Sequence, residues 1–429
     1  MIVGLMFALF AILLAFGVPI AFAMGLSAVA ALLIDGSVPL LVLPQRVFSS
    51  LDSFGLLAIP LYIFAGELMN LGGVTSAIVQ FARSLVGHLR GGLGQVNIVT
   101  SIIFAGISGS AAADCAAVGS MLLPAMAREG YKREWSVVIT AAASILGPII
   151  PPSILMVLYG SMTGLSIGTL FLAGIIPGLI MAAAMMILVY VKADAIGAPR
   201  YPRASLPEIG ASFGKAAPAL VMPVLIIGGI LSGVFTPTEA GIVAVAYGLL
   251  YGFATRQLKP GPVYHFALRG AISTASILII LGSASLFSWI IARAGIPDAI
   301  AAWLSSFTTN GAVVLLIIVL ILLVIGMFIE TISALILVVP VLAPIGNTYG
   351  FDPIHFSIVT IVAVLLGALT PPVAVLLLLA CKIGGVEYAK AMRPLVPFLM
   401  VLSIGLLAIM YWPDLTLWLP RVAMGYGAP

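Results

Sequence analysis

Charged side chains are scarce in this sequence. Asp, Glu, Lys and Arg together make up 7% of its 429 residues, whereas soluble domains average about 25%. Hydrophobic residues make up 62%, so the chain is predicted to be an all-α polytopic membrane protein in contact with the lipid bilayer. The net charge is +4, with no basic patch interleaved with aromatic residues, and no nucleic-acid partner is expected.

Cysteines and the usual catalytic motifs are also nearly missing. Cys115 and Cys381 are the two cysteines, and both lie in apolar stretches where they are expected to be small buried residues. There is no His-Glu-x-x-His motif and no phosphate-binding loop. A hydrolase built on Ser108 or Ser110 with Asp114 would lack a suitable base nearby. The sequence therefore predicts that the protein is not an enzyme. Separately, residues 1–16 are apolar but lack the basic start of a signal peptide, so no cleavable signal peptide is expected.

Glycine and proline, by contrast, are abundant, with 45 and 28 residues. The most informative of them form Gly147-Pro-Ile-Ile-Pro-Pro152 and Gly367-Ala-Leu-Thr-Pro-Pro372, each inside a long apolar segment. Proline removes a backbone donor and disfavours helix at the preceding residue. A broken helix at membrane depth persists only where protein, water or an ion satisfies the freed backbone groups. Paired broken helices in matching halves are typical of the binding site of a secondary transporter.

The two breaks belong to an internal duplication with a spacing of 220 residues. At that spacing Gly106 matches Gly326, Pro124 matches Pro344 and Pro177 matches Pro397. The sequence predicts two repeats joined by a polar cytoplasmic linker. The predicted divisions are 1–191 (scaffold 1–94, then a hairpin and a broken helix over 95–191), the linker 192–216, and 217–429 (scaffold 217–311, then a hairpin and a broken helix over 312–412).

Basic residues orient the repeats. If 95–126 and 312–345 are re-entrant hairpins, each half crosses the membrane an odd number of times and the halves are inverted. A cytoplasmic linker then leaves only Arg46, Arg293 and Arg421 outside, as the positive-inside rule favours. The fifteen basic residues placed inside are Arg83, Arg90, Arg128, Lys132, Arg133, Lys192, Arg200, Arg203, Lys215, Arg256, Lys259, Arg269, Lys382, Lys390 and Arg393.

The predicted hairpin tips carry the candidate site residues. The first tip is Gly106-Ile-Ser-Gly-Ser-Ala-Ala-Ala-Asp114, where hydroxyls and free carbonyls suit a hard cation such as Na⁺; the alternative is close packing of small residues. Asp114 is either functional or a hydrogen-bonding link between the arms. In the second tip, Glu330 could bind a cation, carry a proton or cap a half-helix. The candidate substrate-binding residues are Ser108, Gly109, Ser110, Asp114, Ser153, Glu330 and Thr331.

Two further acidic positions are predicted to be mainly structural. Thr236-Pro-Thr-Glu239 has the pattern of a capped helix start. Glu67 could contact a partner subunit or cap a backbone break. Because no Lys or Arg is expected at the membrane centre, an anionic substrate would depend on half-helix N-termini and co-bound cations. A channel is a weaker alternative, since twin breaks fit a mobile carrier better.

Six motifs together resemble the large membrane subunit of tripartite ATP-independent periplasmic (TRAP) transporters over nearly the whole chain. They are Gly-Ile-Ser-Gly-Ser…Ala-Asp at 106–114, Pro-Pro-Ser at 151–153, Phe-Thr-Pro-Thr-Glu-Ala at 235–240, Gly-Met-Phe-Ile-Glu-Thr at 326–331, Asp-Pro-Ile-His-Phe at 352–356 and Thr-Pro-Pro-Val at 370–373. The resemblance implies Na⁺-driven symport of an organic acid by an elevator mechanism in the bacterial inner membrane. It also implies a small four-helix membrane subunit, expected as a separate chain, and a periplasmic substrate-binding protein. The alternative is a single-component Na⁺/dicarboxylate symporter.

The resemblance further implies two or more transported Na⁺ ions, held where each hairpin tip meets its broken helix. The residues it points to are Ser108, Ser110, Gly147 and Pro151 for one site, and Gly326, Thr331, Gly367 and Thr370 for the other. Two positions depart from the family pattern at the second site. This chain has Ala363 where the family usually has Asn, and Ala374 where it usually has Gly.

Overall fold

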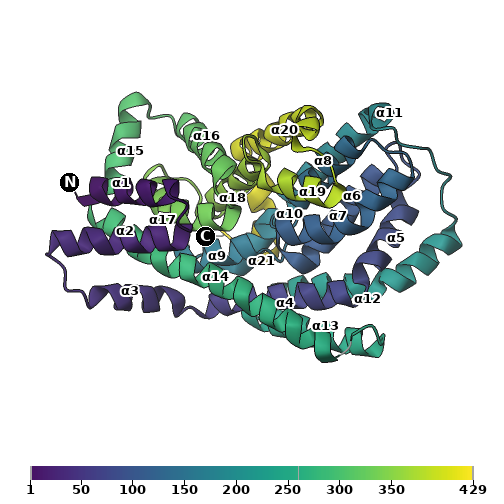
Figure 1. Cartoon of the computed structure of the whole chain (residues 1–429), viewed down its shortest axis with the longest axis horizontal. Coiled ribbons are helices and arrows are strands. Elements are labelled where there is room, and N and C mark those ends of the chain that lie inside the picture. The colour runs from purple at the N-terminus through teal and green to yellow at the C-terminus, as the bar shows by residue number, and fades with distance from the viewer. Residues whose placement is uncertain (1, 259, 428–429) are drawn as a thin grey trace.

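The computed structural model describes residues 2–258 and 260–427. Met1, Lys259, Ala428 and Pro429 lie outside this part. The predicted cytoplasmic position of Lys259 and the predicted outer ends of the two repeats therefore fall outside the described residues. Every secondary-structure element within the described part is helical, which confirms the predicted all-α class. Figure 1 shows the helices packed into one elongated assembly.

Seven helical stretches of the described part are long and apolar enough to cross a membrane. Their lengths of 18 to 31 residues compare with the ~20 residues that span a hydrocarbon core. The stretches are Phe54–Leu71, Ile167–Val191, Leu206–Leu231, Val263–Arg293, Gly311–Phe328, Thr331–Thr348 and Tyr388–Tyr411. Shorter apolar helices accompany them, because glycine and proline interrupt several of the hydrophobic runs.

The N-terminal apolar run divides where the sequence predicts. Helix α1 (Ile2–Ala15) ends before Gly17, and α2 (Ile20–Asp35) begins after Pro19. Gly17 has a φ of 78°, a left-handed conformation that glycine adopts without the steric cost of a Cβ.

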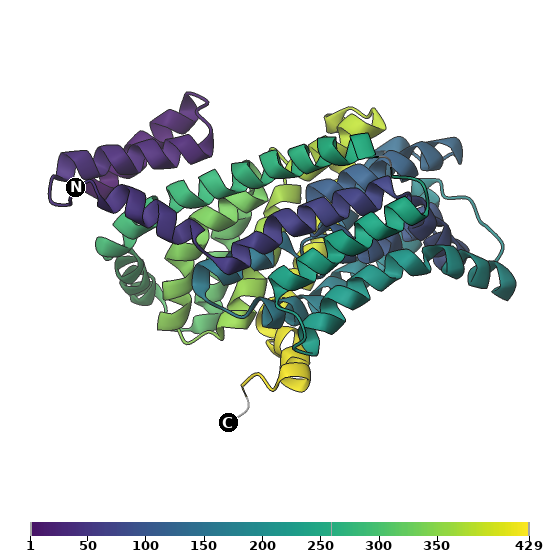
Figure 2. The ribbon, with the colours of Figure 1, turned by 90° about the horizontal axis from the view of Figure 1, so that it is seen from below.

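The scaffold helices, as we call those before each hairpin, form one side of the molecule. Helix α4 lies between α13 and α14, and Figure 2 shows α14 running beside it. Besides α1 and α2, the scaffold helices are α3 (Val42–Leu51), η1 (Phe54–Leu57), α4 (Ala58–Leu71), α5 (Val74–Val86), α12 (Leu206–Leu231), α13 (Pro237–Ala254), α14 (Pro260–Arg293) and α15 (Ile296–Phe307).

Two scaffold helices begin with capping boxes. At α13, the Thr236 backbone N–H donates to Glu239 Oε2 at 2.8 Å, and the Glu239 N–H donates to Thr236 Oγ1 at 3.3 Å. This is the helix start that the sequence predicts. At α12, Ser205 and Glu208 make the same pair of bonds. Helix α12 therefore begins within the range predicted as linker, because a capping box can start a helix in polar sequence.

The remaining helices recur at the 220-residue spacing. In the first repeat they are α6 (Leu93–Ser108), α7 (Ala111–Arg128), α8 (Arg133–Ser144), α9 (Ile154–Thr163) and α10 (Ile167–Val191), followed by the short α11 (Ala193–Ile196). In the second repeat they are α16 (Gly311–Phe328), α17 (Thr331–Thr348), α18 (Pro353–Leu369), α19 (Val375–Gly384) and α20 (Tyr388–Tyr411), followed by α21 (Asp414–Met424). The bounds of α7 and α17 differ by 220 at both ends, which supports the predicted duplication.

Each repeat contributes one unit made of a hairpin and a broken helix. The first unit is α6–α9 and the second unit is α16–α19, and both breaks contain a cis Pro–Pro bond. The two units interlock, because α7 packs on α19 while α17 packs on α9. This exchange brings the two hairpin tips to the centre of the molecule (Figure 1).

Candidate functional site

The first hairpin tip rests directly on the first broken helix. The Ile154 N–H at the start of α9 donates to the Gly109 carbonyl at 3.3 Å. Gly109 has a φ of 61°, and a Cβ added there would lie 2.6 Å from the Pro152 carbonyl oxygen. A Cβ on Gly147 would lie 3.1 Å from the Ser110 carbonyl oxygen. The predicted contact between tip 106–114 and break 147–152 is therefore present, and glycine is required for it.

Ser108 offers an oxygen with no partner in this contact. The residue is 4% exposed, and its hydroxyl makes no hydrogen bond to any described group. An unpaired buried hydroxyl costs about 1–3 kcal/mol, so a ligand at this position would relieve a real penalty. Ser110, in contrast, caps α7 by accepting a bond from the Ala113 N–H at 3.4 Å.

Two predicted site residues point elsewhere. Ser153 is fully buried, and its hydroxyl donates to the Pro148 carbonyl at 2.6 Å and caps α9. Asp114 lies inside α7 rather than at the tip itself, and it is fully buried with neither carboxylate oxygen paired among the described residues. Neither side chain lines the cavities at the tips.

The second tip, like the first, is a two-residue connection between helices, formed by Ile329 and Glu330. Glu330 is exposed, and its Oε2 accepts bonds from the Ile332 N–H at 3.0 Å and the Ser333 N–H at 3.2 Å. Of the three roles considered for Glu330, the structure therefore shows the cap of a half-helix. Thr331, the first residue of α17, is 8% exposed.

The second tip meets its broken helix through two glycines. A Cβ on Gly326 would lie 2.6 Å from the Val364 carbonyl oxygen, and one on Gly367 would lie 2.7 Å from the Leu323 carbonyl oxygen. Helices α16 and α18 thus touch backbone to backbone at this crossing. Thr370 follows the crossing, and its hydroxyl donates to the Leu366 carbonyl at 2.6 Å. Its oxygen accepts no hydrogen bond from the described residues and remains open to a cation.

A small cavity of about 70 Å³ lies between the two tips. Four helices present their N-terminal turns to it, two from each unit. The first two residues of each helix line the cavity: Ala111 and Ala112 of α7, Ile154 and Leu155 of α9, Thr331 and Ile332 of α17, and Val375 and Leu376 of α19. Each helix N-terminus carries about +0.5 elementary charge. The cavity between the tips is therefore suited to an anion.

A larger cavity of about 420 Å³ adjoins the first and shares Ser110, Ile154 and Ile332 with it. Its walls are formed by the face of α7 and by α4 and α14 of the scaffold. The scaffold residues include Glu67, Asn70 and Ser273. The sequence singled out Glu67 but did not place it at this cavity, and it gave no signal for Asn70 or Ser273. The reason is that helix periodicity does not tell which helix a buried face will contact.

The positive potential of the site comes from the backbone, while the described side chains that line it add two carboxyl groups, Glu330 in the small cavity and Glu67 in the larger one. The described residues that line the two cavities include no Lys, Arg or His. Nor does any group of three or more His, Cys, Asp and Glu side chains gather in the described part of the chain. A cation here would therefore be held by hydroxyls and backbone carbonyls, the ligands that suit Na⁺ and not a transition metal.

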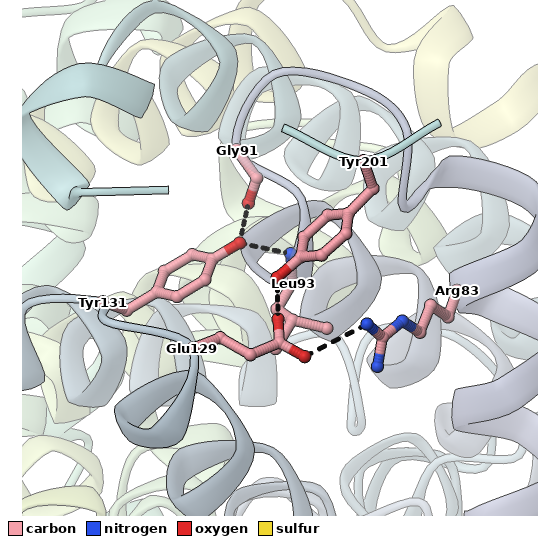
Figure 3. A network of polar contacts seen from close by, with 6 residues as sticks. All are labelled: Arg83, Gly91, Leu93, Glu129, Tyr131 and Tyr201. Atoms are coloured by element: carbon pink, nitrogen blue, oxygen red, sulfur yellow. Dashed lines mark hydrogen bonds and ion pairs between the residues drawn. The ribbon is translucent and has the colours of Figure 1, made fainter. Parts of the chain in front are cut away.

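The base of the first hairpin is anchored by a polar network (Figure 3). Arg83 of α5 contacts Glu129 at 3.1 Å and stacks on the Tyr201 ring, and the Tyr201 hydroxyl donates to Glu129. Tyr131 accepts a bond from the Leu93 N–H at 2.7 Å. Burial raises the pKa of Tyr131 to about 12, so its hydroxyl keeps its proton. The network joins the hairpin to a scaffold helix and to the linker.

Sequence comparisons with known proteins all lead to one transporter family. The family model described as "Tripartite ATP-independent periplasmic transporter, DctM component" matches residues 7–415. The chain is 38% identical over 413 residues to the sialic acid TRAP transporter large permease protein SiaM of Vibrio cholerae, covering 96% of each. It is 35% identical over 399 residues to the C4-dicarboxylate large permease protein DctM of Pseudomonas aeruginosa, covering 93% of each.

Two solved transporters share the fold at low sequence identity. The Alcanivorax borkumensis YdaH transporter superposes with a TM-score of 0.60 at 18% identity, covering 90% of this chain and 88% of that one. Neisseria gonorrhoeae MtrF superposes with a TM-score of 0.59 at 14% identity, covering 87% and 84%.

Proposed function

We propose that this chain is a Na⁺-coupled symporter of an organic acid. The proposal starts from its family: the chain belongs to the DctM components of tripartite ATP-independent periplasmic transporters, which are multi-pass inner-membrane proteins. The observation that carries the proposal is the meeting of four helix N-termini at the cavity between the tips. The named relatives transport sialic acid, 2,3-diketo-L-gulonate or C4-dicarboxylates, all of them acids.

The organic acid would place its carboxylate at the N-termini of α7, α9, α17 and α19. No basic side chain among the described lining residues neutralises it, so the helix dipoles and nearby cations supply the positive potential. The rest of the acid would extend into the larger cavity, where Ser110, Asn70 and Glu67 offer hydrogen-bonding groups.

Na⁺ would bind where each tip meets its broken helix. Ser108 would supply its unpaired hydroxyl at the first contact, where a Cβ built on Gly106 lies 3.9 Å from the Pro151 carbonyl oxygen and one built on Gly147 lies 3.1 Å from the Ser110 carbonyl oxygen. At the second contact Thr370 and Thr331 supply hydroxyls near the crossing of Gly326 and Gly367. Two cations beside one carboxylate lower the cost of holding each charge in a low-dielectric interior, which couples the two solutes.

Transport would follow an elevator movement of the two units along the scaffold. The hairpins are re-entrant in this proposal. The larger cavity lies along α7 in the direction of Arg128, the end that the proposal assigns to the cytoplasm, so this conformation would correspond to an inward-facing state. A small four-helix membrane subunit would extend the scaffold, and a periplasmic binding protein would deliver the acid.

The test is uptake by the reconstituted three-part complex in proteoliposomes. Sialic acid, succinate and 2,3-diketo-L-gulonate serve as radiolabelled probes, with Na⁺ outside or replaced by choline. We expect saturable uptake of at least one probe that requires Na⁺ and the binding protein. Uptake that is equal in choline would refute Na⁺ coupling, and non-saturable flux would indicate a channel.

A further inference from the structure

A second pair of cavities lies apart from the tips, and one of the two is at the interface between the scaffold and the units. One, which we call the serine chamber, has a volume of about 270 Å³ and is lined by α3, the segment before η1, α9, α14 and α17. Its polar lining consists of six serines: Ser49, Ser50, Ser53, Ser161, Ser285 and Ser288. The other cavity, of about 300 Å³, shares Met162 and Pro340 with the serine chamber.

The hydroxyls of the serine chamber leave capacity for a ligand. The Ser161 hydroxyl is buried and has no hydrogen-bond partner among the described residues. The Ser50 and Ser285 hydroxyls donate to Val47 and Gly282 carbonyls of their own helices at 2.8 Å. These two oxygens keep lone pairs that can accept a bond from a solute. No charged side chain is among the described residues that line the chamber.

The serine chamber lies farther along α14, towards Arg293, than the larger tip cavity does. On α14, Ile277 lines the tip cavity and Leu281 lines the serine chamber, a separation of about 6 Å along the helix axis. On α9, the fully buried Met156, Val157 and Leu158 separate the two cavities. A layer of apolar side chains about one helical turn thick therefore closes the path between them.

The outer end of the chamber carries positive charge. Trp289 follows Ser288, and the guanidinium groups of Arg46 and Arg293 lie 5.3 and 5.5 Å from its ring. These are two of the three basic residues that the charge distribution places outside. Asp35 offsets part of this charge, because it accepts a bond from Ser37, which in turn accepts one from Arg293.

We propose that the serine chamber is an outer transit site that binds the organic acid on its way between the periplasmic side and the tips. This inference rests on the proposed function. The Ser161 hydroxyl has no partner among the described residues and can donate to a carboxylate, and the Ser50 and Ser285 oxygens can accept bonds from hydroxyl groups of the acid. Without a charge in the lining, these bonds hold the acid weakly. Weak binding suits a waypoint, since a solute must enter readily and also leave. The arginines at the outer end raise the local concentration of anions.

Cysteine labelling tests the chamber, because Cys115 and Cys381 are both buried and give a low background. Ser288→Cys and Ser53→Cys are made in the full complex in right-side-out vesicles, and an impermeant methanethiosulfonate reagent is added outside. We expect both variants to be modified. We also expect the probe acid that is taken up fastest, added with Na⁺, to slow modification several-fold, whereas Na⁺ alone does not.

A matched control lies on a neighbouring outer helix. Ser305 of α15 is exposed and does not line the chamber, so Ser305→Cys is expected to be modified at a rate that the acid leaves unchanged. Equal protection of Ser305→Cys, or no modification of Ser288→Cys and Ser53→Cys, would overturn the transit site. If the wild type takes up the acid but the acid does not protect the cysteines of the two variants, the transit-site proposal is wrong and the proposed function stands. If the wild type takes up no acid, both proposals are wrong.

Uptake kinetics supply an independent readout that does not depend on labelling. Ser288→Ala is expected to raise KM for the acid about fivefold with little change in the maximal rate, as expected for one lost hydrogen bond. Ser288→Thr keeps the hydroxyl and is expected to restore the KM. An unchanged KM in Ser288→Ala, Ser53→Ala and the double variant would refute the proposal.

Discussion

The two units share a sequence pattern and differ in how their tips are held. In the first unit Gly109 is buried and Ser110 is half-buried, and a backbone hydrogen bond joins Gly109 to Ile154. In the second unit Glu330 and Pro372 are exposed, and the closest contact is the helix crossing at Gly326 and Gly367. Equivalent residues therefore occupy a closed contact in one unit and a more open one in the other.

The bases of the hairpins differ in the same way. Glu129 at the end of the first hairpin is paired with Arg83, a charged contact. Its counterpart at the 220-residue spacing is Tyr349, whose hydroxyl donates to the Ala301 carbonyl at 3.2 Å. A duplicated sequence thus gives two different attachments.

Substituting the matched glycines separates the two helix crossings. Gly367→Ala brings a Cβ to 2.7 Å from a carbonyl oxygen, whereas Gly147→Ala brings it to 3.1 Å. We expect Gly367→Ala to cost about 1–3 kcal/mol through overpacking and to abolish uptake, with a smaller loss for Gly147→Ala. Thermal unfolding in detergent and uptake measure both. Gly228→Ala is the control, since nothing lies within 4 Å of its added Cβ.

Removing the Ser108 hydroxyl tests the cation site of the first unit. The hydroxyl is buried and unpaired among the described residues, so we expect Ser108→Ala to raise the Na⁺ concentration for half-maximal uptake by about tenfold. Ser27→Ala serves as the control, because that buried hydroxyl already donates to the Met24 carbonyl at 3.0 Å. A Na⁺ dependence identical in Ser108→Ala and wild type would exclude Ser108 as a ligand.

Neutralising Glu330 tests the charge balance of the second tip. Glu330 caps α17 beside the cavity that four helix N-termini surround. Because Glu330→Gln keeps an acceptor and removes the negative charge, we expect KM for the acid to fall about two- to threefold, for a gain of ~0.5 kcal/mol. Initial uptake rates measure the change. A raised KM would mean that the carboxylate of Glu330 assists binding directly.

Weakening the two hairpin bases compares a charged attachment with a neutral one. Glu129→Gln removes the ion pair with Arg83, and Tyr349→Phe removes one neutral hydrogen bond. Each is expected to cost less than about 1 kcal/mol. The loss of melting temperature in Glu129→Gln should shrink at high salt, since surface charges are screened, while that of Tyr349→Phe should not. If the loss of melting temperature depended on salt equally in Glu129→Gln and Tyr349→Phe, the two hairpin bases would not differ as a charged and a neutral attachment.

The smallest expected change in stability is that of Ala374→Gly. It has a φ of 45° at the start of α19, a left-handed conformation that costs an L-residue roughly 1–2 kcal/mol. Glycine relieves this cost but loses about 0.5–1 kcal/mol in conformational entropy, so Ala374→Gly should stabilise the protein only slightly. A melting temperature in detergent at or just above that of wild type is expected, and a clear drop would contradict it.

The sequence alone determined the all-α class, the two helix breaks and their 220-residue repeat. These features follow from local chemistry, because the adjacent prolines at 151–152 and 371–372 each remove two backbone donors and a long apolar run becomes helical in lipid. Gly109, Ser110 and Thr331 were predicted at the tips for the same reason. The start of α12 was not predicted, because polar residues 206–216 look like a linker until the capping box at Ser205 is seen.

Only the tertiary structure decided which residues face one another. It placed Ser153 and Asp114 away from the cavities and brought Glu67 and Asn70 of α4 to them. It also set α9 against α17 and α7 against α19, so that N-termini from both units meet in one cavity. Helical periodicity reports that a face is buried, but the partner of that face depends on how the whole chain packs.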